Sequence, residues 1–206
     1  MVATKKPRTK APLHSDTRAQ LLMIGTEILS EKGFFSTGVE EVLSKAGVPK
    51  GSFYYYFDSK AAFGFAVVEN YEKIWAQKLT RLLCDAAVPP IERIHNYISE
   101  GERGLEKYNY RRGCLVGNIG QEMNLLDEQF RERILSIFAS WGEFIRKCLE
   151  EARERGDISS DIDIQEVSQF FWLAWEGAIL QAKLEHSTRP IEEFRSVLFK
   201  RILRKE

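Results

Sequence analysis

The residue that offers the most chemistry in this sequence is Cys114, which closely follows the pair Arg111-Arg112. The spacing places Cys114 just inside the N-terminus of a short predicted helix, where backbone amides and the two arginines should lower the pKa of a thiol. A low pKa favours the thiolate, which is the form that attacks electrophiles. Two amide side chains, those of Asn118 and Gln121, fall near the same helical face. The pattern predicts a binding or reaction site for a small molecule.

A second group of candidate binding residues lies later in the chain, in a segment that is apolar on nearly every side. Helical spacing puts several side chains on one face, with Trp175 beside them: Trp172, Glu176, Ile179 and Lys183. An aromatic wall with a few polar groups is the usual composition of a small-molecule pocket. We therefore expect this face and Cys114 to line one pocket.

Lys183 is the predicted cation of this pocket. Its ammonium would bind a ligand carboxylate, or its charge would keep Cys114 ionised. Packing is the alternative for the other members, because a free cysteine usually lies in a core and because Trp172 and Trp175 would serve a core or a subunit interface equally well. The remaining cysteines, Cys84 and Cys148, lie on apolar helical stripes, which predicts core positions for both.

The segment 37–57 carries the signals of two short helices. Thr37 and Glu40 have the spacing of a capping box, in which each side chain bonds to the free backbone amide of the other residue. Gly47 ends the first helix, and Pro49 suits the first turn of the second, where a helix needs no amide hydrogen. Two short helices joined by a tight turn that contains glycine are typical of a helix-turn-helix, which binds DNA.

The start of the second short helix supplies the predicted base contacts. Residues at that end normally reach base edges in the major groove, and Gly51 would let the backbone approach closely. Tyr54 and Tyr55 should point outward, where their hydroxyls can donate to phosphates. Phe53, Tyr56 and Phe57 lie on the opposite face, which predicts that they pack in the core.

Two further residues complete the predicted DNA contacts. Thr37 lies at a helix N-terminus, where a hydroxyl and backbone amides together favour a phosphate. Lys60 lies in the first turn of the next predicted helix, where the helix dipole disfavours a cation unless a phosphate is near. The complete predicted set is Thr37, Lys50, Gly51, Ser52, Tyr54, Tyr55 and Lys60.

The elements that must position these residues are predicted to be all α-helical. After an N-cap at Ser15 or Asp16, periodicity indicates about nine helices and no strand, with approximate ranges 16–33, 37–46, 49–57, 58–85, 90–108, a short helix after 113, 127–156, 164–185 and 190–203. We expect a basic flexible arm over 1–14, a three-helix helix-turn-helix domain over 15–60 and a helical ligand-binding and dimerisation domain over 61–206.

Composition and charge narrow the class of protein. Apolar residues make up 44% of the 206 residues, enough for a core, but they form neither a membrane span nor a secretory signal. The chain has no net charge, yet nine Lys/Arg against six Asp/Glu leave residues 1–60 at +3. The basic residues of the arm would lie on phosphates or in a minor groove, or they would form a solvated tail.

The three cysteines form no C-x-x-C pair, so the sequence predicts no metal site, and it carries no recognisable catalytic or cofactor-binding motif. The simplest setting for three thiols is the reducing cytoplasm.

With Gly33-Phe34 before it, the stretch from Thr37 to Lys60 resembles the DNA-binding signature of the TetR family of bacterial transcriptional repressors. The resemblance implies three N-terminal helices, a fourth helix that leads to a regulatory core, and a homodimer formed through the last two helices. It also implies that the partner is double-stranded operator DNA.

Two more stretches, Arg111–Met123 and Trp172–Lys183, resemble the acrylate-responsive repressors within that family and, more loosely, the electrophile-sensing repressor of N-ethylmaleimide reductase. This resemblance implies a repressor that a small unsaturated carboxylate or electrophile releases from DNA. The looser relative has a cysteine and a lysine at the positions of Cys114 and Lys183.

Two other functions compete with this interpretation. An enzyme could use Cys114 as a nucleophile, but it would need a base, and His14, His95 and His186 are predicted to lie in the arm, on an exposed helix and at a helix end. A constitutive DNA-binding protein without an inducer is the second alternative, and stabilisation by a ligand would distinguish it. Activation in place of repression also stays open.

Overall fold

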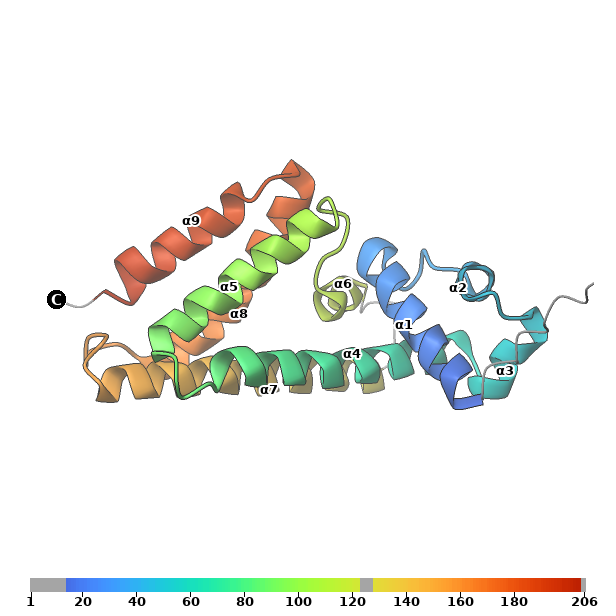
Figure 1. Ribbon diagram of the computed structural model, residues 1–206, viewed down its shortest axis with the longest axis horizontal. Helices are drawn as coiled ribbons and strands as arrows, with labels where there is room; N and C mark the ends of the chain where they lie inside the picture. Colours follow the sequence, from blue (N-terminus) through green and yellow to red (C-terminus); the bar gives the residue numbers. More distant parts are fainter. Residues whose placement is uncertain (1–13, 123–127, 205–206) are drawn as a thin grey trace, which may run out of the picture.

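The computed structural model describes residues 14–122 and 128–204, and within these ranges the chain forms nine α-helices and no strand (Figure 1). The all-helical prediction is confirmed. The predicted basic arm lies outside the described residues except for His14, which begins the first helix. Asp127, the predicted start of the seventh helix, also lies outside them. None of the helices in the described ranges is both long and apolar enough to cross a membrane.

The helix-turn-helix lies at one end of the molecule (Figure 1). Its helices are α1 (His14–Lys32), α2 (Val39–Ala46) and α3 (Phe53–Tyr56), and a 3-10 turn at Lys50–Ser52 precedes α3. α1 begins at His14, earlier than the predicted caps at Ser15 or Asp16 would allow. Gly33 and Gly47 follow the ends of α1 and α2 as predicted, with φ of 81° and 64°, a backbone conformation that glycine adopts without a Cβ clash.

The capping box predicted at Thr37 and Glu40 is wrong. The N-cap residue of α2 is Gly38, and no side chain caps this helix. The Thr37 hydroxyl donates to the Gly33 carbonyl at 2.7 Å, and Thr37 is only 2% exposed. The hydroxyl therefore closes the turn that follows α1, a pairing that the spacing of Thr37 and Glu40 does not reveal.

The larger domain is built from the remaining helices. Their bounds are α4 Lys60–Leu83, α5 Pro90–Lys107, α6 Leu115–Gln121, α7 Glu128–Glu154, α8 Ile164–Glu185 and α9 Arg189–Val197, with a π-helical turn at Leu198–Ile202. α4 and α7 run lengthwise, α5, α8 and α9 slant across them, and short α6 lies between α5 and α1 (Figure 1). Ser59, and not Asp58 as predicted, caps α4, because its hydroxyl accepts from the Ala62 amide at 3.0 Å.

The core of this domain is rich in aromatic side chains, and α8 carries several of them. α8 spans the predicted range, and its Trp172 and Trp175 are buried. Cys148 is buried as predicted and donates to the Leu83 carbonyl at 3.1 Å. The core position predicted for Cys84 is wrong, because this residue follows the end of α4 and is exposed.

Candidate functional site

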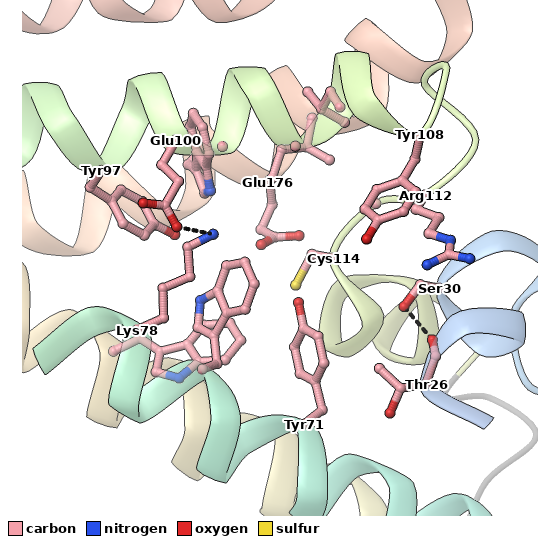
Figure 2. A pocket seen from close by; sticks show the side chains of 18 of the residues that line it. Thr26, Ser30, Tyr71, Lys78, Tyr97, Glu100, Tyr108, Arg112, Cys114 and Glu176 are labelled. Carbon is pink, nitrogen blue, oxygen red and sulfur yellow. Dashed lines mark hydrogen bonds and ion pairs between the residues drawn. The ribbon is translucent and has the colours of Figure 1, made fainter. Parts of the chain in front are cut away.

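A cavity of about 260 Å³ lies where the helix-turn-helix meets the larger domain (Figure 2). Its walls come from α1, α4, α5, α7 and α8 and from the loop that leads into α6. The lining residues are Thr26, Glu27, Ser30, Tyr71, Trp75, Lys78, Tyr97, Glu100, Gly101, Gly104, Leu105, Tyr108, Arg112, Gly113, Cys114, Trp141, Trp172, Trp175, Glu176 and Ile179.

Cys114 lies at the centre of this cavity (Figure 2). It is the N-cap residue of α6, and its sulfur accepts from the Gly117 amide at 3.4 Å. The predicted low pKa is wrong: burial and the neighbouring Glu176 carboxyl raise the pKa of the thiol well above its ordinary value. The arginines predicted to oppose this effect face α1 instead, with Arg111 near Glu31 and Arg112 near Glu27. The resting thiol is therefore protonated.

The Glu176 carboxyl faces the Cys114 sulfur from α8 (Figure 2). Burial raises its pKa to about 7, an effect that the neighbouring thiol offsets only in part. Its Oε2 lies against the α carbon of Gly117, where there is no room for a side chain. Its Oε1 is buried and has no hydrogen-bond partner. A buried carboxyl with an unpaired oxygen can form a hydrogen bond with a polar ligand group.

Aromatic side chains form a large part of the cavity wall. Trp172 and Trp175, both predicted for the pocket, line it together with Trp141 from α7. The indole N–H groups of Trp141 and Trp172 are buried without a hydrogen-bond partner. Tyr71 and Tyr108 point their hydroxyls toward the Cys114 sulfur (Figure 2). The cavity thus combines apolar faces with unpaired donors, which is how proteins bind small polar molecules.

Three of the predicted ligand residues do not line the cavity. Asn118 donates from its side-chain amide to the Ser30 carbonyl at 2.8 Å, so it holds α6 against α1. Gln121 is exposed at the end of α6. Lys183 packs over Gly113, behind the cavity wall; burial lowers its pKa, and the Cys114 sulfur partly restores it.

The cations that line the cavity, Lys78 and Arg112, were not among the predicted site residues. Lys78 pairs with Glu100 at 3.4 Å, and Arg112 pairs with Glu27 at 3.5 Å. Arg112 has a sequence signal, since it precedes Cys114, but its place beside the cysteine predicts an electrostatic effect on the thiol and not a position in the cavity wall. Lys78 is one of several charged residues on α4 and carried no signal that sets it apart. His95 and His186 do not line the cavity.

The predicted DNA-binding surface lies at the far end of the helix-turn-helix. Tyr54 and Tyr55 are 66% and 71% exposed, whereas Phe53 and Phe57 are buried, as predicted, and Tyr56 is partly buried against the core. Lys50, Gly51 and Ser52 form the turn before α3; Lys50 and Gly51 are exposed, Ser52 partly so, and the Lys50 ammonium pairs with Glu40.

The other two predicted contacts have partners inside the protein. Thr37 is buried, as described above, so its hydroxyl does not face a phosphate. The Lys60 ammonium donates to the Phe35 carbonyl at 3.3 Å and lies 4.7 Å from the centroid of the Phe34 ring. Burial lowers the pKa of Lys60. These contacts explain why a cation is tolerated at the start of α4.

Comparison with protein families gives two matches along the chain. Residues 21–67 match the model of bacterial regulatory proteins of the tetR family. Residues 90–198 match the model of the tetracyclin repressor-like C-terminal domain. The first match covers α2, α3 and most of α1, and the second covers most of the residues of the cavity wall.

Known proteins resemble the chain over most of its length. The transcriptional regulator AcuR of Cereibacter sphaeroides is 41% identical over 184 residues, which cover 89% of this chain and 84% of AcuR. The transcriptional repressor NemR of Escherichia coli is 33% identical and covers 86% of this chain and 89% of its own. The crystal structure of a TetR regulatory protein from Rhodobacter sphaeroides superimposes with a TM-score of 0.85, at 40% identity, over 88% of this chain and 96% of that chain.

These matches extend through both the DNA-binding helices and the cavity-bearing domain. The chain is therefore a helix-turn-helix transcriptional regulator of the TetR family.

Proposed function

We propose that this protein is a homodimeric repressor that binds operator DNA and is released from it by a small unsaturated carboxylate or electrophile. The observation that carries the proposal is the shared cavity wall. Thr26, Glu27 and Ser30 of α1 line the same cavity as Cys114 and Glu176. A ligand in this cavity therefore contacts the helix-turn-helix and the larger domain at once, so that binding there can shift the position of one relative to the other.

The exposed start of α3 supports the DNA-binding part of the proposal. Lys50, Gly51 and Ser52 would reach base edges, while Tyr54 and Tyr55 would donate to phosphates on either side. We leave Thr37 out of this set because it is buried. Lys60 stays in it as a phosphate contact that would first have to leave the Phe35 carbonyl.

An apolar surface on α8 and α9 supports the dimer. Leu173 and Leu184 are each 75% exposed, and Phe170, Leu180 and Val197 are exposed as well. A groove between the two helices is lined in part by Phe170, Phe194 and Val197. Exposed apolar patches of this kind mark subunit interfaces. Two subunits joined here would present two recognition helices to successive major grooves.

The chemistry of the cavity supports a small polar ligand. A volume of about 260 Å³ and walls rich in aromatic side chains suit a molecule of few atoms. The protonated Cys114 thiol would contact such a ligand without reaction. For an activated C=C bond, addition would join sulfur to the β carbon and transfer the thiol proton to the α carbon, and the Glu176 carboxyl, which faces the thiol (Figure 2), would carry that proton. Lys183 would act on Cys114 through its charge.

Hydrogen bonds from α6 and from the loop before it to the end of α1 support a route from the cavity to DNA. The Gly113 amide and the Asn118 side chain both donate to the Ser30 carbonyl, at 3.2 and 2.8 Å. A ligand that displaces Cys114 would move α6 and, through these bonds, α1. Such a regulator acts on DNA in the cytoplasm, in keeping with three free cysteines.

Fluorescence anisotropy of the purified protein on DNA from upstream of its own gene tests the proposal. Binding should be tight and salt-sensitive, and sodium acrylate should weaken it. Tight binding that neither acrylate nor N-ethylmaleimide weakens would overturn the proposed inducer class, and absence of binding to that DNA and to DNA from neighbouring genes would overturn the repressor itself.

A further inference from the structure

Arg112 lines the cavity and contacts the DNA-binding helices through the carboxylate of Glu27. We propose that Arg112 binds the carboxylate of the ligand, and that the ligand thereby takes the guanidinium away from Glu27 of α1. This inference rests on the proposed function: Arg112 recognises the anion, and binding of the anion breaks the contact between Arg112 and Glu27.

Arg112 is incompletely paired in the cavity wall. Its guanidinium lies over the Tyr108 ring, 4.2 Å from the ring centroid, and one nitrogen lies 3.5 Å from the Glu27 carboxylate. Its Nε is buried and has no hydrogen-bond partner. A buried N–H without a partner is unfavourable, and a carboxylate that accepts from Nε and a terminal nitrogen together would satisfy it.

Glu27 has a second and closer partner on the DNA-binding side. The Lys45 ammonium of α2 lies 2.9 Å from the same Glu27 oxygen that faces Arg112. Glu27 therefore stays paired with Lys45 when Arg112 leaves, so its carboxylate is not left without a cation. It removes an ion pair between the loop that carries Arg112 and the helix-turn-helix, which loosens the hold of the larger domain on α1.

Arg112 suits this task better than the other two cations near the cavity. Lys78 lies 4.3 Å from the Trp75 ring centroid and pairs with Glu100, away from α1. Lys183 lies behind Gly113 and does not line the cavity. The planar guanidinium fork also matches a carboxylate in a way that an ammonium does not.

Titration of the full-length dimer with sodium acrylate and with acrylamide, its uncharged analogue of similar shape, tests the carboxylate contact. The wild-type protein should bind acrylate more tightly than acrylamide. Arg112→Met should weaken acrylate binding roughly 10- to 100-fold and remove the preference for acrylate over acrylamide. Arg112→Lys should restore part of this preference. The matched cavity variant Lys78→Met should retain the preference.

The outcomes separate this inference from the proposed function. If acrylate neither binds the wild-type protein nor releases it from the operator, the role of Arg112 is overturned, and the proposed inducer class falls with it only if N-ethylmaleimide does not release the protein either. If acrylate releases the wild-type protein and Arg112→Met responds in the same way, the proposed function stands and the role of Arg112 is overturned. Loss of acrylate binding in Lys78→Met alone would overturn it as well.

Glu27→Gln tests whether loss of the Arg112–Glu27 pair carries the effect of ligand binding to the DNA-binding helices. This variant should bind acrylate at least as tightly as wild type, because the ligand no longer competes with Glu27, but acrylate should change its operator affinity less. Glu41→Gln is the matched control: it breaks the Glu41–Lys32 pair, which also joins α1 to α2 but lies outside the cavity, and it should respond like wild type. An operator response in Glu27→Gln as large as that of wild type would overturn the transfer step.

Discussion

The Phe34 amide donates to the Glu122 carboxylate at 2.7 Å, which joins the end of α6 to the turn after α1. The Phe35 amide lies 3.3 Å from the same oxygen. Glu122 thus receives two backbone amides from the helix-turn-helix, although it belongs to the larger domain. Together with the Asn118 bond to Ser30, it fixes the DNA-binding helices relative to the cavity.

Glu122→Ala should therefore reduce the effect of acrylate on operator affinity more than it reduces acrylate binding itself. Loss of charge-assisted bonds to two amides should lower the free energy of unfolding by about 1–3 kcal/mol, as measured by urea unfolding. Acrylate binding should persist, while the effect of acrylate on operator affinity should shrink. Glu128→Gln, which breaks an exposed pair with Arg131, should change neither quantity. An unchanged operator response in Glu122→Ala would show that this contact does not transmit the signal.

Glu176 should make the protein less stable as the pH rises. Its pKa in the folded protein is about 7, above the ordinary value of 4.5, because the carboxyl is buried. The folded state therefore retains a proton that the unfolded chain has lost, and this stabilisation is present below about pH 4.5 and is lost by about pH 7. Over that interval Glu176 should account for a decrease of about 3 kcal/mol.

Urea unfolding of the wild-type protein and Glu176→Gln at about pH 5 and about pH 8 measures this contribution. The glutamine variant should lose less stability between the two values than wild type does. Equal losses in the two proteins would mean that Glu176 ionises normally.

Cys114 should react slowly with thiol reagents despite its position at a helix N-terminus. Its thiol is buried and protonated, whereas Cys84 is exposed. Mass spectrometry after brief treatment with N-ethylmaleimide should find label on Cys84 first. Cys114→Ser should still bind operator DNA but should respond less to electrophiles, and Cys84→Ser should respond like wild type. Faster labelling of Cys114 than of Cys84 would contradict the buried thiol.

Leu173 should belong to the subunit interface. Leu173→Glu places a charge on the exposed apolar surface of α8, so light scattering should detect monomers. Operator affinity should fall roughly 100-fold or more, because each monomer then binds only one half-site. Leu135→Glu is the control, since Leu135 is 55% exposed on α7. If Leu173→Glu remains a dimer, the subunit interface does not include Leu173 and lies elsewhere on the protein.

Sequence patterns predicted the helices well because their apolar periodicity is local. α8 was predicted over the residues it occupies, and the stops at Gly33 and Gly47 follow from a backbone conformation that favours glycine. Cap residues were predicted less well. Thr37 and Ser59 show why, because which hydroxyl meets which backbone group depends on how the chain turns between helices.

The site was predicted in part. Cys114, Trp172, Trp175 and Glu176 do line one cavity, since helical spacing defines which side chains share a face. The state of the thiol could not be predicted, because it depends on burial by helices distant in sequence. The same holds for Arg112, whose direction is set by its contacts with Glu27 and Tyr108.

The most direct test of the central claim is whether the cavity and the DNA-binding surface exclude each other's ligands. Calorimetric titration of acrylate into the free dimer and into the dimer saturated with operator DNA measures this. Thermodynamic linkage predicts that DNA weakens acrylate binding by the same factor by which acrylate weakens DNA binding. Equal acrylate affinity in the presence and absence of operator would contradict the account.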